Sequence, residues 1–61
     1  MYLPSDPAML LSVINTKLRD ECESLSDFAD TYDIDLEALS EKLSGFGLRY
    51  DEKTNRIMKE V

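Results

Sequence analysis

This chain of 61 residues contains no histidine and a single cysteine, Cys22. Structural zinc sites are built mainly from cysteine and histidine, so we expect no zinc site. One cysteine cannot form a disulfide within the chain, which favours a reducing compartment. Without histidine there is also no side chain whose ordinary pKa suits a general base near pH 7. Cys22 has acidic neighbours, and its helical spacing from Leu18 predicts a small core residue rather than a nucleophile.

Long apolar stretches are also missing, since the longest run covers only residues 8–11. A membrane-spanning helix needs about 20 apolar residues, so we expect no membrane partner. No basic segment of the kind that opens a signal peptide precedes that run. Proline and glycine occur twice each, and 43% of the residues are hydrophobic, which is typical of a folded domain. We therefore expect a cytoplasmic protein, close to full length, with one domain over residues 1–61.

Basic residues are absent from residues 20–41, which carry nine acidic residues. The flanking segments sum to +1 and +2, so the net charge of −6 comes entirely from this region. Two interpretations remain open. The acidic region could be a solvated face that keeps a small protein in solution, or a docking surface for a basic partner.

Local signals predict three helices. Asp6 as N-cap and Pro7 at the first helical position predict a helix over residues 7–21. Ser24, with Asp27 three positions later, resembles a capping box and predicts a helix over residues 25–32. Asp35 caps a third helix that should end before Gly47 in the left-handed conformation. Helical spacing predicts an inward-facing stripe on each helix, and Met9 and Val13 widen the first one. The other expected inward-facing residues are Leu10, Leu11, Ile14, Leu18, Cys22, Leu25, Phe28, Ala29, Tyr32, Leu36, Leu39, Leu43 and Phe46.

The last third of the chain changes its hydrophobic period from helical to alternating, which predicts strands near residues 48–50 and 56–59. Between them, Asp51 and Asn55 are typical turn residues. The predicted fold class is α+β, mostly α. It is a three-helix bundle with helix-turn-helix-like second and third helices and a C-terminal β-hairpin, winged-helix-like in outline.

That outline suggests DNA binding, but the charges oppose it. The exposed face of the third helix should carry Asp35, Glu37 and Glu41, which would repel phosphates. We therefore expect this helix not to bind nucleic acid. A weaker alternative is binding through the basic residues of the hairpin, Arg49, Lys53, Arg56 and Lys59.

The sequence contains no complete motif for metal binding or catalysis. The run Asp33-x-Asp35-x-Glu37 resembles the start of a calcium loop, but Ala38 and Ser44 stand where that loop needs glycine and glutamate. We expect no metal, no cofactor, no catalytic residues and no enzymatic activity.

Two polar residues of the first helix, Asn15 and Arg19, lie one turn apart beside its apolar stripe. We expect Asn15 to satisfy backbone groups where another segment crosses, and Arg19 to pair with Asp51, Glu52 or an acid of the second helix. The aromatic residues Tyr2, Phe46 and Tyr50 could fill the core or form an exposed patch for a partner.

Several segments together resemble a family of short bacterial proteins of unknown function. They are Leu3-Pro4-Ser5-Asp6-Pro7, Met9 to Ser12, Asn15 to Asp20, Ser24-Leu25, and Gly47 to Asn55. The resemblance runs from end to end and implies a stand-alone bacterial domain, without an activity, cofactor or partner.

The function predicted from these observations is a non-enzymatic protein-binding or adaptor module with an acidic helical surface. Its partner is another protein, or a second copy in a homodimer. The alternatives are a winged-helix-like, nucleic-acid-associated regulator that binds through the hairpin, and an acidic mimic of nucleic acid. The predicted protein-binding residues are Asp27, Asp30, Asp35, Glu37 and Glu41.

Overall fold

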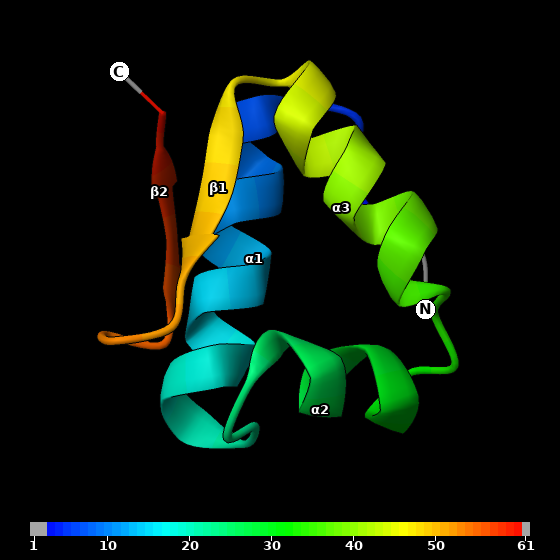
Figure 1. The fold of residues 1–61 in the computed structure, drawn as a ribbon, viewed down its shortest axis with the longest axis vertical. Helices are drawn as coiled ribbons and strands as arrows, with labels where there is room; N and C mark the ends of the chain where they lie inside the picture. The colour runs from blue at the N-terminus through cyan, green and yellow to red at the C-terminus, as the bar shows by residue number, and fades with distance from the viewer. Residues whose placement is uncertain (1–2, 61) are drawn as a thin grey trace.

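Three helices followed by a β-hairpin make up the computed structural model, which describes residues 3–60 (Figure 1). The helices are α1 (Pro7–Asp20), α2 (Leu25–Thr31) and α3 (Leu36–Gly45). The strands β1 (Leu48–Asp51) and β2 (Arg56–Lys59) form a two-stranded antiparallel sheet. The predicted α+β class and order of elements are confirmed, and the predicted boundaries lie within one residue of those observed.

The start of α1 follows the prediction in its position but not in its cap. Asp6 is the N-cap residue and Pro7 opens the helix, yet the Asp6 side chain makes no capping hydrogen bond. The predicted Asp6 carboxylate cap is therefore wrong. Ala8 and Met9, whose N–H groups such a cap would bind, are exposed, so water can satisfy them.

The other two helices begin with the predicted side-chain caps. Ser24 Oγ accepts a hydrogen bond from the Asp27 N–H at 3.0 Å, and Asp35 Oδ1 accepts one from the Glu37 N–H at 3.1 Å. The Asp27 carboxylate accepts from the N–H of Glu23, at 2.9 Å, one residue before the position usual in a capping box. These bonds satisfy backbone donors that the first helical turn leaves free.

The end of α3 and the hairpin turn both use left-handed residues. Gly47 follows the helix with φ of 73°, and Asn55 precedes β2 with φ of 52°, as the sequence predicts. Asp33, between α2 and α3, also has a positive φ, 55°. Asp51 turns the chain by accepting hydrogen bonds from Lys53 N–H at 3.3 Å and Thr54 Oγ at 2.7 Å.

The core gathers apolar side chains from every element. Two expected members are exposed, Met9 at 59% and Leu36 at 38%, and a third, Val13, is only half-buried. The predictions for the first two are wrong. Met9 lies about 100° around α1 from the fully buried Leu10, whereas Leu36 lies one turn before the buried Leu39, where the core does not reach. Leu3 packs against the core, whereas Tyr2 lies outside the described residues. The buried residues are Leu10, Ile14, Leu18, Cys22, Leu25, Phe28, Ala29, Leu39, Leu43, Leu48 and Ile57.

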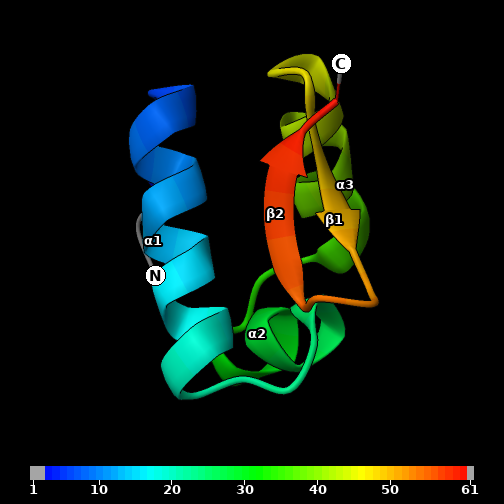
Figure 2. The same cartoon turned by 90° about the vertical axis from the view of Figure 1, so that its left-hand side faces the viewer.

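The hairpin lies between the first and third helices, with β2 beside α1 and β1 beside α3 (Figure 2). Asn15 of α1 joins its helix to β2. Its Nδ2 donates to the Ile57 carbonyl at 2.9 Å, and its Oδ1 accepts from the Ile57 N–H at 2.6 Å. The predicted role of Asn15, satisfying the backbone of a crossing segment, is confirmed.

Candidate functional site

The acidic segment from Asp20 to Glu41 contains both engaged and unengaged carboxylates. Asp20 and Glu21 form ion pairs, and Asp27 and Asp35 cap helices. Within residues 3–60, the remaining acids of this segment form no ion pair and are exposed; they are Glu23, Asp30, Asp33, Glu37 and Glu41. Asp27 and Asp35 keep their negative charge because their partners are neutral backbone amides, so seven carboxylates of the segment contribute to its negative potential.

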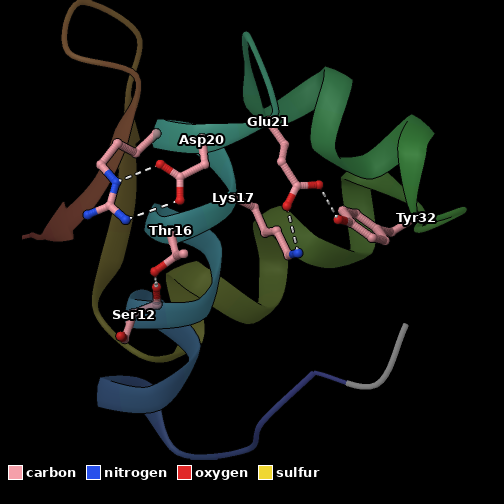
Figure 3. Close-up of polar contacts among 7 residues, drawn as sticks. Ser12, Thr16, Lys17, Asp20, Glu21 and Tyr32 are labelled. Atoms are coloured by element: carbon pink, nitrogen blue, oxygen red, sulfur yellow. Dashed lines mark hydrogen bonds and ion pairs between the residues drawn. The ribbon is translucent and has the colours of Figure 1, made fainter.

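A polar cluster of Lys17, Glu21 and Tyr32 joins the end of α1 to the end of α2 (Figure 3). Glu21 accepts from Lys17 Nζ at 2.9 Å and from the Tyr32 hydroxyl at 3.0 Å. Both bonds lower the pKa of Glu21, and the bond from Lys17 has the larger effect. The same bond to the Glu21 carboxylate raises the pKa of Lys17. Lys17 Nζ also lies 5.5 Å from the centre of the Tyr32 ring. The cluster fixes the two helices together and neutralises Glu21.

Arg19 pairs with its neighbour Asp20 and not with the acids of the hairpin or α2. Its Nε and Nη2 donate to the two Asp20 oxygens at 2.9 and 3.1 Å, which lowers the pKa of Asp20. The predicted pairing of Arg19 with Asp51, Glu52 or an α2 acid is wrong. Asp51 is already occupied by the turn, and adjacency in the chain makes Asp20 the nearer partner.

The five predicted protein-binding residues differ in whether their carboxylates are already engaged within the fold. The carboxylates of Asp27 and Asp35 are engaged in helix capping. Asp30 is exposed on α2, and Glu37 and Glu41 are exposed one turn apart on α3. Like charges at this spacing repel and reduce helix stability by about 0.2–0.5 kcal/mol. A basic partner would relieve this repulsion, so Glu37 and Glu41 are the part of the predicted surface that a basic partner would stabilise most.

A groove of about 430 Å³ lies next to these two glutamates, and we call it the acidic groove. Leu36 and Ser40 of α3 line it, each preceding one of the glutamates in the chain, so the glutamates lie on the adjacent helical ridge. Leu25 and Tyr50 supply further apolar surface. The other lining residues are Glu23, Ser24, Ser26 and Glu52. The lining thus combines apolar side chains with two carboxylates and includes no basic residue.

The four predicted nucleic-acid-binding residues are not gathered on one face. Arg49 pairs with Met58 and Arg56 with Asp51, whereas Lys59 pairs with Leu48, so strand alternation places Lys59 on the opposite face of the hairpin. Lys53 lies in the turn. The hydrogen bond from Thr54 is the main reason that the pKa of Asp51 is lowered. The Lys53 N–H and the nearby charges of both arginines lower this pKa further. The hairpin therefore presents dispersed charges and no continuous basic surface.

Cys22 is 5% exposed in the core. Burial raises the pKa of its thiol, and the nearby carboxylates of Asp27 and Glu21 add to that effect. Cys22 thus has the environment of a structural cysteine. Across residues 3–60, no group of histidine, cysteine or acidic side chains is arranged to hold a metal ion. The same residues include no helix with the length and apolar character needed to cross a membrane.

The fold and these surfaces define a small α+β domain with charged grooves between its elements. The chain belongs to the DUF4250 family, a domain of unknown function whose sequence pattern matches residues 4–57. The resemblance to a family of unknown function is thereby confirmed. No curated protein and no solved structure matches the chain.

The acidic groove was not predicted from the sequence, because its lining residues come from four places: the α1–α2 connection, the first turn of α2, α3 and the hairpin. No linear motif joins Glu23, Leu36 and Tyr50. The one available signal was Leu36 itself, an apolar residue in the first helical turn beside two acids.

Proposed function

We propose that this domain is a non-enzymatic protein-binding module whose acidic groove receives a basic, partly apolar segment of another protein. The observation that carries the proposal is the groove itself, where exposed Leu36 lies beside carboxylates that have no ion pair within residues 3–60. An apolar side chain of the partner would bury Leu36 and Tyr50. Lysine or arginine on the same segment would meet Glu23 and Glu52 at the groove, and Glu37 and Glu41 beside it.

Charge complementarity supports this choice of partner over nucleic acid. The net charge of −6 and the unneutralised acids of α2 and α3 attract a basic segment and repel a polyanion. The helix-turn-helix-like order of α2 and α3 is the argument for a nucleic-acid-associated regulator, and the dispersed hairpin bases weaken it. We further propose a cytoplasmic, bacterial setting, in keeping with the single cysteine and the family resemblance.

The test is affinity capture with the tagged protein from cells at low salt, before and after nuclease treatment, followed by binding assays with the purified partner. Leu36→Ser removes the apolar contact, and Glu37→Lys with Glu41→Lys reverses the neighbouring charge. We expect a nuclease-resistant partner whose affinity falls at least about tenfold in each variant, equivalent to about 1.4 kcal/mol. Binding to wild type should also weaken as salt rises.

Matched controls lie outside the groove. Met9→Ser removes a more exposed apolar side chain, and Glu60→Lys reverses an exposed acid; both should leave binding unchanged. The proposal fails if the controls weaken binding as much as the groove variants do. Recovery of nucleic acid, with all protein lost after nuclease, would favour the regulator instead. Concentration-dependent self-association that Leu36→Ser abolishes would identify the partner as a second copy.

A further inference from the structure

A second groove, of about 650 Å³, lies between α1 and the end of the hairpin, and we call it the arginine groove. Its lining includes Arg19 from α1 and Arg56 from β2, and no acidic residue. Two carboxylates lie just outside this lining: Asp20 is paired with Arg19, and Asp51 is the cross-strand partner of Arg56. The other lining residues are Leu11, Ser12, Asn15, Thr16, Leu18, Thr54 and Asn55.

Two asparagines hold the walls of this groove in place. Asn15 bonds both backbone groups of Ile57 on β2. Asn55 donates to the carbonyls of Leu18 and Cys22 at 3.2 and 3.1 Å, which ties the turn to the end of α1. Since both walls are fixed by hydrogen bonds, a ligand would meet a preformed site and lose less free energy to ordering.

The groove retains hydrogen-bond donors that the fold does not use. Arg19 commits two of its five N–H groups to Asp20, so three remain. Within residues 3–60, Arg56 forms no ion pair. Ser12 and Thr16 lie along the same side of α1 as Asp20, and the Thr16 hydroxyl donates to the Ser12 carbonyl at 2.8 Å (Figure 3). The Ser12 hydroxyl is exposed and donates no hydrogen bond to residues 3–60.

We propose that the arginine groove binds a small organic phosphate, with the phosphate group held by Arg19 and Arg56 and the organic part lying along Leu11. Guanidinium groups match the geometry of phosphate oxygens and keep their charge at all ordinary pH values. The volume lies within the range usual for small-molecule sites, about 300–1,000 Å³. A small phosphate is favoured over a nucleic acid because the repulsion from the net negative chain grows with the charge of the ligand. This inference is independent of the acidic groove and its partner.

The test is an NMR titration of the folded chain at low ionic strength with adenosine 5′-monophosphate, with inorganic phosphate and with adenosine. We expect saturable shifts at groove residues with the two phosphates and none with adenosine. Arg56→Gln and Arg19→Gln should each weaken binding at least about tenfold, as expected for loss of a charge-assisted contact. Asp20→Asn should tighten it, because it releases Arg19.

Arg49→Gln is the matched control, since it removes the same charge from the hairpin at a position that does not line the groove. It should change the affinity less than about twofold. Equal weakening by Arg49→Gln and Arg56→Gln would mean diffuse attraction and would overturn the proposal. So would the absence of saturable shifts at about 10 mM phosphate, a weakly binding range. Tighter binding of a single-stranded oligonucleotide than of the monophosphate would replace the small ligand with nucleic acid.

Discussion

At the scale of single residues, Asn15 contributes more to the tertiary structure than its polar character suggests. Its amide carries a donor and an acceptor side by side, and both are used on the backbone of one buried residue, Ile57. Loss of this side chain would leave an N–H and a carbonyl without partners between two packed elements. Unpaired buried groups of this kind cost about 1–3 kcal/mol each.

Asn15→Ala should therefore lower the free energy of unfolding by about 2–3 kcal/mol, a large part of the stability of so small a domain. Urea denaturation followed by circular dichroism measures this. Thr16→Ala is the control, because Thr16 is exposed and its hydroxyl bonds only within its own helix. Its effect should stay within about 0.5 kcal/mol. Equal losses in the two variants would show that the Asn15 bonds contribute nothing beyond a surface substitution.

At the scale of helices and strands, the boundaries could be predicted because their signals are local. Ser24 and Asp35 bond amide groups two or three residues away, and Gly47 needs only its own backbone freedom. Burial was harder to predict than boundaries, because helical spacing wrongly placed Leu36 and Met9 in the core. Helical spacing identifies which face of a helix is apolar, but it does not tell how far along that face another element reaches.

The two glycines at the end of α3 allow a direct test of this boundary. Gly45 is helical and Gly47 has φ of 73°, and nothing lies within 4 Å of a Cβ added at either position. Gly45→Ala should raise the free energy of unfolding by about 0.5–1 kcal/mol, and Gly47→Ala should lower it by about 1 kcal/mol. Thermal unfolding of the two variants measures the difference. A stabilising Gly47→Ala would contradict the left-handed end of the helix.

At the scale of the whole molecule, the sequence predicted the fold class and the excess of acid, but not how the charges divide between two grooves. Glu23, Leu36 and Tyr50 meet in one groove, and Arg19 and Arg56 in the other, only after the hairpin has packed against the helices. Arg19 and Arg56 are 37 positions apart, so no spacing rule could have joined them. The polar side of α1, with Ser12, Thr16 and Arg19, was the only hint.

The charge arrangement also predicts the response to acid. The folded state lowers the pKa of Asp20, Glu21 and Asp51, each mainly through a side-chain hydrogen bond. A lowered pKa adds stability above the ordinary carboxyl value, about 4, and this stability is lost as the pH falls through the lower folded value. Stability should therefore decrease on acidification below about pH 4.

Glu21→Gln isolates one of these contributions. Wild type should exceed the variant in stability by a constant amount above about pH 5, and this difference should shrink below about pH 4 as Glu21 becomes protonated. Urea denaturation over a pH series measures it. Glu60→Gln removes the same charge from a side chain with no ion pair within residues 3–60, and it serves as the control. A difference that grows on acidification would contradict the ion-pair role of Glu21.

The contact between Asn15 and Ile57 also bears on how these molecules behave at high concentration. The outer edge of a hairpin normally presents free peptide groups, on which a strand from another molecule can pair and begin aggregation. Here the Asn15 amide occupies the peptide groups of Ile57, inside a strand of four residues, as a neighbouring strand would. The side chain thus blocks strand addition at Ile57, and the packing of α1 protects the β2 edge from edge-to-edge assembly.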